Sequence, residues 1–317
     1  MRDTAETWAV VLAGGDGSRL RALTTTREGL IVPKQYCSLG RSPCLMQDAL
    51  LRAESVALPS HICAVVAAEH RRWWETAAGG LKSANLFVQP QNKGTAHGIL
   101  LSLLMLQRIN PNAQVTLLPS DHYFRDETTL SRLLRVALNL ASAEAGAIYL
   151  LGAEPDAPDP ELGYILPAER VRDKAANITG FAEKPAADFA RELISQGALW
   201  NLFILVGSVR SLLELYAEHH SRSVLQMRDA LAEQAAGDRQ SLAALYDRLP
   251  SVDFSHDILE VQATRLRVLR VPYCGWTDLG TPQRVDSILR SMMTVGLREP
   301  RSEPPLFFDL YAARQGP

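Results

Sequence analysis

The sequence predicts an α/β protein built on one mostly parallel sheet, and three observations lead to that class. Short apolar runs alternate with amphipathic stretches from the first residues onward. Glycines or an aspartate directly follow several of the apolar runs, as is typical of strand ends that carry a ligand site. The 317 residues are 47% hydrophobic and 21% charged, which is the ordinary composition of a globular protein.

The first half of the chain alternates strands with helices. Short continuous apolar runs are typical of buried strands, and apolar residues at helical spacing predict amphipathic helices. Thr95 stands where a helix N-cap is expected. This order predicts βαβ units with right-handed crossovers, and therefore a Rossmann-like sheet flanked by helices. The predicted strands are 8–13, 62–68, 84–89, 114–120 and 146–152, and the predicted helices are 45–56, 95–108 and 127–144.

The pattern changes after residue 152. A loop rich in proline and aspartate leads to two short strands, GYILP and NITGFAEKP, which we expect to pair as a small antiparallel insertion at the sheet edge. We assign one catalytic domain to residues 1–285 and a C-terminal helix with a short Pro-rich tail to residues 286–317. Further helices are predicted at 186–197, 208–219 and 222–247, and further strands at 198–206 and 266–273.

The charge and cysteine content exclude several classes of partner and site. Lys and Arg number 33 against 35 Asp and Glu, so no overall field attracts nucleic acid or an anionic membrane. The four cysteines show no C-x-x-C pairing and are expected to be reduced. The first residues do not form a signal peptide, and the longest apolar run is too short to span a membrane. We therefore expect a cytoplasmic protein.

The segment LAGGDGSRL has the composition of an anion-binding loop. Gly14, Gly15 and Gly17 let backbone amides approach a phosphate closely, and Arg19 can contact phosphate oxygens with two donors. A dinucleotide-binding loop is excluded because Leu20 stands where the third glycine belongs, and the P-loop pattern is absent. A plain glycine turn with a surface arginine remains an alternative for this stretch alone.

Three other segments offer the remaining groups that a nucleotide site needs. Lys34 in PKQ can be a second phosphate cation, and Gln89 has both a donor and an acceptor for the edge of a base. Asp121 ends an apolar strand, where a carboxylate can hold Mg²⁺ together with phosphate oxygens. Each has a structural alternative: a solvated lysine, a glutamine at a turn before a capped helix, and a turn aspartate.

Nine segments in order resemble the sugar-1-phosphate nucleotidyltransferase family. They are most similar to its mannose-1-phosphate guanylyltransferase branch, which PKQ with the preceding TRE favours. Each segment alone is weak, whereas nine in the same order are specific. The segments are LAGGDGSRL (12–20), TREGLIVPKQY (26–36), QPQNKGTA (89–96), LPSDHYF (118–124), GYI (163–165), FAEKP (181–185), WN (200–201), VDFSHDILE (252–260) and GWTDLG (275–280).

The resemblance implies transfer of GMP from GTP to mannose-1-phosphate, giving GDP-mannose and pyrophosphate in one Mg²⁺-assisted in-line displacement. Thymidylyl or uridylyl transfer to glucose-1-phosphate stays open, because base choice depends on a few hydrogen bonds. A sugar-nucleotide-binding regulatory homologue with little catalysis also stays open. The implied partners are a nucleoside triphosphate and a sugar-1-phosphate, and a homodimer is left open.

The resemblance also implies a role for each matching residue. Arg19 and Lys34 would neutralise the triphosphate, and Asp121 and Asp278 would hold one Mg²⁺. The remaining roles are phosphate wrapping by Gly14, Gly15 and Gly17, a base and ribose pocket of Gln89, Gly94 and Thr95, and a sugar-phosphate site of Gly163, Glu183, Lys184 and Asn201.

Two departures from the family pattern weaken parts of this assignment. Asp16 places a carboxylate between the glycines, where it is unfavourable beside a triphosphate unless it turns to solvent or helps to hold a metal. Leu202 and Phe203 stand where small residues let the backbone approach the sugar. The sugar site is therefore less well supported than the phosphate site.

Overall fold

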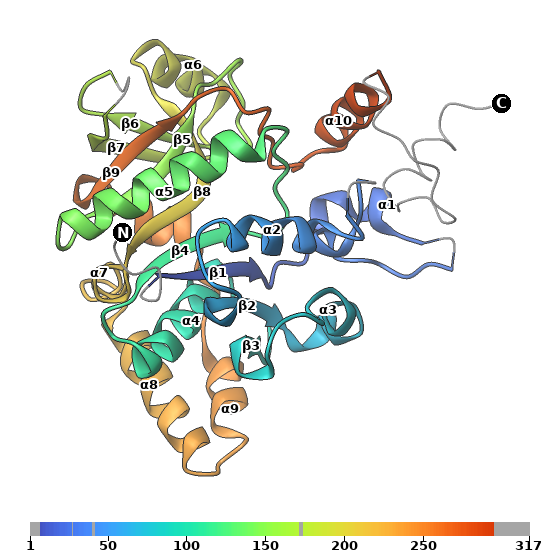
Figure 1. Cartoon of the computed structure of the whole chain (residues 1–317), viewed down its shortest axis with the longest axis vertical. Helices are drawn as coiled ribbons and strands as arrows, with labels where there is room; N and C mark the ends of the chain where they lie inside the picture. The colour runs from blue at the N-terminus through green and yellow to red at the C-terminus, as the bar shows by residue number, and fades with distance from the viewer. Residues whose placement is uncertain (1–6, 27, 40–41, 171–173, 295–317) are drawn as a thin grey trace.

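The computed structural model describes residues 7–26, 28–39, 42–170 and 174–294. Within them nine strands form one sheet in the order β3-β2-β1-β4-β8-β5-β9-β7-β6, and β6 also pairs with β8 (Figure 1). The strands are β1 (Thr7–Ala13), β2 (Ile62–Ala67), β3 (Leu86–Gln89), β4 (Gln114–Pro119), β5 (Ile148–Ala153), β6 (Gly163–Pro167), β7 (Ala176–Glu183), β8 (Leu199–Ser208) and β9 (Leu266–Val271).

The first four strands form the parallel part of the sheet. β1 pairs in parallel with β2 and β4, and β2 pairs in parallel with β3. Ala13 lies opposite Val66, and Leu12 lies opposite Pro119, so the carboxyl ends of these three strands finish almost level. The loops that follow β1, β2 and β4 therefore meet on one side of the molecule.

The second part of the sheet is mixed. β8 lies antiparallel between β4 and β5, whereas β5 and β9 are parallel. β6 and β7 pair antiparallel, as predicted for the insertion at the sheet edge. The predicted parallel arrangement is thus confirmed for β1–β4 and for β5 with β9. β8, at the centre of the sheet, runs antiparallel to its neighbours β4 and β5.

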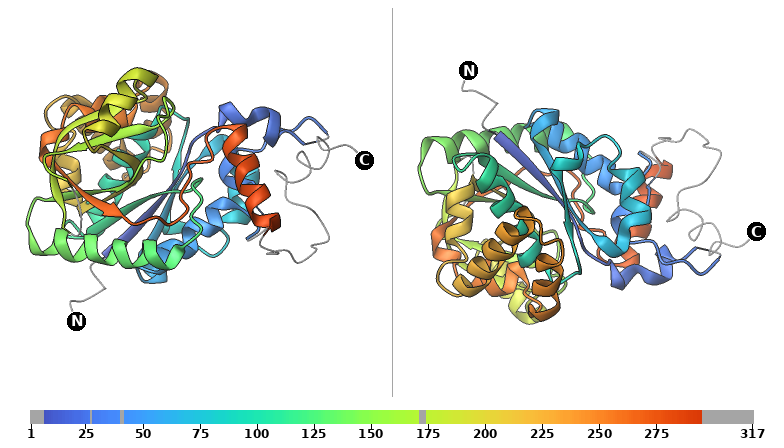
Figure 2. Two further views of the ribbon diagram at one scale, coloured as in Figure 1. Left: turned by 90° about the horizontal axis from the view of Figure 1, so that it is seen from above. Right: turned by 90° about the horizontal axis from the view of Figure 1, so that it is seen from below.

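Helices cover both faces of the sheet (Figure 2). Alternation along β1 sends Trp8 and Val10 into one core cluster with α4, α7, α8 and α9, and Ala9 and Val11 into another with α2, α3, α5 and α10. The helices are α1 (Arg21–Thr24), α2 (Leu45–Glu54), α3 (Arg71–Ala77), α4 (Thr95–Ile109), α5 (Glu127–Ala143), α6 (Ala187–Ser195), α7 (Val209–Glu214), α8 (Ser221–Ala235), α9 (Ser241–Arg248) and α10 (Pro282–Thr294).

Three helix predictions need correction. The segment 222–247 forms two helices, α8 and α9, because the chain turns at Gly237 with φ +112°. The helix predicted at 208–219 is shorter, since α7 ends at Glu214. The N-cap of α4 is Gly94, whose φ is +88°, and Thr95 is the first helical residue.

The C-terminal helix begins before the domain boundary expected at residue 285. α10 starts at Pro282, and its Val285 and Leu289 are buried in the second core cluster. It lies at the same end of the molecule as α1 (Figures 1 and 2). The predicted Pro-rich tail (298–317) lies outside the described residues. In the described ranges no helix is both long and apolar enough to cross a membrane.

Candidate active site

The glycine loop after β1 is fixed by the segment that contains PKQ. Gly17 has a φ of +60°, and a Cβ there would lie 2.8 Å from the Cβ of Lys34. The side-chain amide of Gln35 donates to the backbone carbonyls of Ala13 at 3.0 Å and Gly15 at 2.8 Å. Sequence reasoning assigned a role to the lysine and missed Gln35, which holds the loop in shape.

Lys34 joins two carboxylate residues that are far apart in the sequence. Its side chain is buried, and Nζ lies 2.9 Å from Oδ2 of Asp121 and donates to the backbone carbonyl of Asp278 at 2.5 Å. Burial alone would raise the pKa of Asp121, but the charge of Lys34 outweighs it and the net pKa is lowered. Asp121 is therefore ionised at neutral pH, and one ammonium contacts the carboxylate of Asp121 and the backbone carbonyl of Asp278.

The carboxylate of Asp278 faces a cation from the C-terminal helix. Its Oδ1 accepts from the backbone N–H of Gly280 at 2.9 Å and from Arg284 of α10. Arg284 also pairs with Asp159, in the loop before β6. Burial would raise the pKa of Asp278, but the neighbouring Lys34 and Arg284 charges lower it. Sequence reasoning missed Arg284, whose only signal was a cation six residues after a predicted metal ligand.

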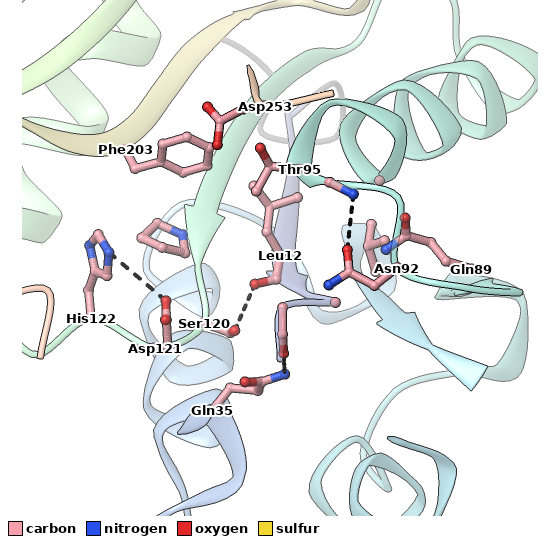
Figure 3. A pocket seen from close by; sticks show the side chains of 16 residues that line it. Leu12, Gln35, Gln89, Asn92, Thr95, Ser120, Asp121, His122, Phe203 and Asp253 are labelled. Atoms are coloured by element: carbon pink, nitrogen blue, oxygen red, sulfur yellow. Dashed lines mark hydrogen bonds and ion pairs between the residues drawn. The ribbon is translucent and has the colours of Figure 1, made fainter. Parts of the chain in front are cut away.

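A cavity of about 320 Å³ lies at the carboxyl ends of the parallel strands (Figure 3). Figure 3 places Asp121, His122 and Phe203 on one side and Gln89, Asn92 and Thr95 on the other. Asn92, His122, Phe203 and Asp253 line it without having been assigned to the site from the sequence. Six predicted site residues line it, namely Gly14, Gly15, Gln89, Gly94, Thr95 and Asp121.

Gln89 is held against the glycine loop. Its side chain is buried, and a Cβ on Gly14 would lie 2.4 Å from Nε2 of Gln89. Gly98, on α4, would bring a Cβ to 3.1 Å from the same nitrogen. The hydroxyl of Tyr246 donates to Oε1 at 3.4 Å. The glutamine thus depends on two glycines for its place beside the cavity.

The loop before α4 is joined to the segment around residue 252. A Cβ on Gly94 would lie 2.2 Å from the carbonyl oxygen of Val252, so only glycine fits there. The hydroxyl of Thr95 accepts from the backbone N–H of Phe254 at 2.9 Å. Thr95 therefore fixes a neighbouring loop instead of capping its own helix.

Phe203 lies on the cavity wall in a strained backbone conformation. Its φ is +54°, a region that favours glycine, and its N–H donates to Oδ1 of Asn201 at 3.0 Å. The ring packs edge-on against Phe254 with centroids 6.2 Å apart. Leu202 is fully buried in the core, so of the two unusual residues only Phe203 reaches the cavity.

His122 is a neutral hydrogen-bond acceptor in this site. Trp276 Nε1 donates to Nδ1 of His122 at 3.2 Å, and burial lowers the pKa of His122 to about 4. An imidazole in that state forms part of the wall and carries no charge at neutral pH.

The predicted sugar-phosphate residues lie close to one another. A Cβ on Gly163 would lie 2.6 Å from Oε2 of Glu183 and 3.5 Å from the Cβ of Asn201. Lys184 has a φ of +48°, and its Nζ lies 3.1 Å from Oε1 of Glu183. Burial raises the pKa of Glu183. These four residues lie together, although they are not part of the cavity lining in the described structure.

Arg19 points toward the loop before β6. Its Nη1 lies 2.6 Å from Oε2 of Glu161, and both side chains are about half exposed. It does not belong to the cavity lining among the described residues. Its predicted contact with the triphosphate remains a prediction.

Comparison with known proteins gives one family and several relatives. The family described as "Nucleotidyl transferase" matches residues 8–295. The chain is 29% identical over 287 residues to "Xanthan biosynthesis protein XanB" of Xanthomonas campestris, covering 86% of this chain and 57% of that protein. It is 26% identical over 289 residues to "Mannose-1-phosphate guanylyltransferase" of Salmonella montevideo, covering 86% and 58%. The chain thus spans a little over half the length of these curated relatives.

A solved structure extends the likeness to the fold. The protein described as "mannose-1-phosphate geranyltransferase", from Thermus thermophilus, superposes with a TM-score of 0.75 at 27% identity, covering 89% of this chain and 79% of that one.

Proposed function

We propose that this chain, a member of the nucleotidyl transferase family, transfers GMP from GTP to mannose-1-phosphate and forms GDP-mannose and pyrophosphate. The family model that matches residues 8–295 confirms the family predicted from nine sequence segments. The relatives named for mannose-1-phosphate support the choice of substrates. The observation that carries the proposal is the buried Lys34, which joins Asp121 and Asp278 next to the glycine loop and the cavity.

In the proposed reaction an oxygen of the sugar phosphate attacks the α-phosphorus of the triphosphate. The bond from that phosphorus to the bridging oxygen breaks, and pyrophosphate leaves with the electron pair. The attacking phosphate is already ionised, so no general base is needed, and catalysis consists of alignment and charge neutralisation. His122 agrees with that requirement, because burial lowers its pKa to about 4, which makes it a weak base, and its Nδ1 already accepts from Trp276.

The described geometry supports binding of different parts of the substrates by different parts of the site. The N–H groups of Gly14, Gly15 and Gly17, with Lys34 and Arg19, would bind the phosphates. Gln89, Gly94 and Thr95 would contact base and ribose, because they line the cavity opposite Asp121. The cluster of Gly163, Glu183, Lys184 and Asn201 would hold the sugar phosphate.

The residues present fit a magnesium ion at Asp121. Its carboxylate is ionised, about one-third exposed and on the cavity wall, so one oxygen can coordinate an ion while Oδ2 contacts Lys34. Asp278 would complete the site if Arg284 moves from its Oδ1. When bound, Mg²⁺ supplies charge neutralisation for the phosphates.

Pyrophosphate release tests this proposal. Each of GTP, UTP, dTTP and ATP is combined with mannose-1-phosphate and glucose-1-phosphate in the presence of Mg²⁺. GTP with mannose-1-phosphate is expected to react fastest. A preference for UTP or dTTP with glucose-1-phosphate would support the alternative transferase. No turnover with any pair would favour the sugar-nucleotide-binding homologue, for which the strained Phe203 in the cavity is the specific observation.

Two variants test the assigned carboxylates. Asp121→Asn and Asp278→Asn are each expected to lower kcat by at least about 100-fold, because each would remove a group that acts on the phosphates. Glu75→Gln, in an exposed pair with Arg71, is the matched control. A carboxylate variant with a near-normal rate would remove that residue from the metal site.

A further inference from the structure

Asn92 lines the cavity and has no part in the reaction as proposed so far. It lies half-buried in the loop between β3 and α4, three residues after Gln89. Its Oδ1 accepts from the backbone N–H of Gly94 at 3.0 Å, a turn that asparagine side chains form with the backbone two residues further on. Because the amide nitrogen can only donate, this hydrogen bond fixes which end of the amide is turned away from the loop.

The fixed amide presents a donor to the cavity. In Figure 3 the Nδ2 of Asn92 points toward the middle of the lining side chains, and no described residue accepts from it. Gln89 has a similar arrangement, because its Oε1 accepts from Tyr246 at 3.4 Å and no described residue accepts from its Nε2. On this side of the cavity the two amide oxygens are thus used by the protein, and the two amide nitrogens remain for a ligand.

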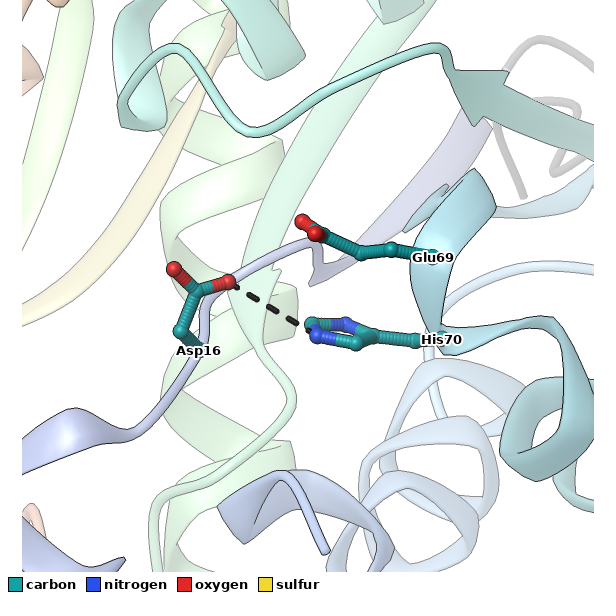
Figure 4. A group of neighbouring side chains, drawn as sticks. All are labelled: Asp16, Glu69 and His70. Atoms are coloured by element: carbon teal, nitrogen blue, oxygen red, sulfur yellow. Dashed lines mark ion pairs between the residues drawn. The ribbon is translucent and has the colours of Figure 1, made fainter. Parts of the chain in front are cut away.

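The carboxylates that could accept from a ligand lie elsewhere. Figure 3 draws Asp121 and Asp253 on the side of the cavity away from Asn92. Asp16, on the glycine loop, is exposed and does not line the cavity among the described residues. Its Oδ1 lies 3.7 Å from Nε2 of His70, toward which Figure 4 shows it turned. The side of the cavity that contains Asn92 therefore favours a ligand with an acceptor there.

A free donor distinguishes two classes of nucleobase. Guanine, uracil and thymine have a carbonyl oxygen at the position where adenine and cytosine have an amino group. The oxygen can accept from Nδ2 of Asn92, whereas an amino group would meet it donor to donor and leave both groups without a partner. Leu12 and Val65 line the same cavity and offer apolar contact to the flat face of a base.

We propose that Asn92 is a specificity-determining residue, which selects triphosphates of oxo bases over those of adenine and cytosine through its Nδ2. Rotating the amide to present Oδ1 instead would break the hydrogen bond to Gly94, so the selection is built into the loop. This selection rests on the proposed function, since it requires a nucleoside triphosphate in the cavity. It does not require that the base is guanine, because uracil offers the same oxygen.

Binding of nucleotides to the purified protein tests the assignment without any turnover. Equilibrium dialysis with Mg²⁺ and no sugar phosphate compares GTP with ATP and UTP with CTP, so that each pair keeps one ring type. The affinity ratio of oxo to amino base, in the pair that binds more tightly, is expected to be at least about tenfold for the wild type.

Asn92→Asp exchanges the donor for an acceptor and keeps an oxygen for the N–H of Gly94. It is expected to lower the affinity ratio at least about tenfold, because a carboxylate accepts from an amino group and repels a carbonyl oxygen. The added negative charge weakens the binding of every triphosphate by a common factor, which the ratio removes.

Asn110→Asp is the matched control, since it makes the same change in the same kind of turn. Its Oδ1 accepts from the backbone N–H of Asn112 at 3.0 Å, and it does not line the cavity among the described residues. The affinity ratio of this variant is expected to equal that of the wild type.

Two results would overturn the assignment of Asn92: a wild-type ratio near one, and a ratio that Asn92→Asp leaves unchanged. Either could occur in an active guanylyltransferase, so the proposed function would survive it. Conversely, a wild type that binds UTP far better than both CTP and GTP, with a ratio that falls in Asn92→Asp, would contradict guanylyl transfer and support the role of Asn92.

Discussion

At the scale of single residues, Phe203 is unusual because it occupies a conformation that suits glycine. Its φ of +54° is held by the hydrogen bond from its N–H to Asn201. Its ring contacts Phe254 and lines the cavity. A residue in the left-handed region costs of the order of 1–3 kcal/mol, and such strain concentrates at ligand sites.

Two substitutions at this position separate the strain from the ring. Phe203→Gly and Phe203→Ala both remove the ring, but only glycine also relieves the backbone. We therefore expect Phe203→Gly to have a free energy of unfolding about 1 kcal/mol higher than Phe203→Ala. Urea denaturation measures the difference. Equal stability of the two variants would show that the backbone stores no strain at this position.

At the scale of elements, the loop before α4 depends on close contact with the segment around residue 252. Gly94 has a φ of +88°, and Val252 lies directly against it. Gly80, by contrast, has no unusual φ, and a Cβ added there would meet open space. These two glycines make a matched pair for testing how tightly the loops are joined.

Alanine substitutions test that junction. Gly94→Ala is expected to lower the free energy of unfolding by at least about 2 kcal/mol, because strain and a steric clash act together. Gly80→Ala is expected to change it by less than about 1 kcal/mol. Thermal and urea denaturation give both values. A Gly94→Ala protein as stable as the wild type would mean that the two loops separate easily.

His97, on α4, makes stability depend on pH. It is buried, its Nε2 lies 2.9 Å from the carbonyl oxygen of Pro250, and burial lowers its pKa below 6.5. The unfolded chain then binds more protons than the folded one as the pH falls through 6.5, so folded stability decreases there.

We expect His97→Gln to weaken that pH dependence. Urea midpoints of wild type and variant are compared at pH 7.5 and pH 5.5. The wild type is expected to lose more stability over this interval, because glutamine does not titrate. If the free energy of unfolding of both proteins falls equally between pH 7.5 and pH 5.5, His97 is protonated as readily in the folded state as in the unfolded chain.

The elements show what sequence patterns can predict. A continuous apolar run such as WAVVLA identifies a strand buried on both faces, because the side chains on both sides of the strand are apolar. The same runs carry no information on direction, so the antiparallel placement of β8 was not predictable from ALWNLFILV. The break between α8 and α9 at Gly237 had a signal, since glycine weakens a helix interior.

At the scale of the whole molecule, the C-terminal helix reaches the candidate site from the opposite end of the sequence. Arg284 of α10 contacts both Asp278 and Asp159, and Val285 and Leu289 of the same helix are buried. A charge pair with largely buried side chains is costly to break by removing one partner.

Removal of that cation is expected to be measurable. Arg284→Gln should lower the free energy of unfolding by about 3 kcal/mol, because Asp278 and Asp159 lose their shared cation. Arg191→Gln removes an exposed ion pair on α6 and should cost no more than about 0.5 kcal/mol. Guanidinium denaturation of the two variants checks this, and equal losses would argue against a structural role for the α10 contact.

The candidate site was predictable in its residue types and less so in its contacts. Asp121 and Asp278 were identified from motifs, and Lys34 contacts the carboxylate of the first and the backbone carbonyl of the second. Their role as metal ligands remains a prediction. The roles of Gln35 and Arg284 depend on which backbone carbonyl or carboxylate lies opposite each side chain. Such contacts arise from packing between distant segments, and no local pattern encodes them.

The position of β8 affects the order in which this chain can fold during synthesis. β4 and β5 both pair with β8, so their facing edges stay unpaired until residues 199–208 leave the ribosome. Unpaired apolar edges associate with one another, and non-local pairing is slow. A chain truncated at residue 198 should therefore aggregate on expression, which sedimentation measures. A soluble monomer would show that β1–β7 are stable without β8 and β9.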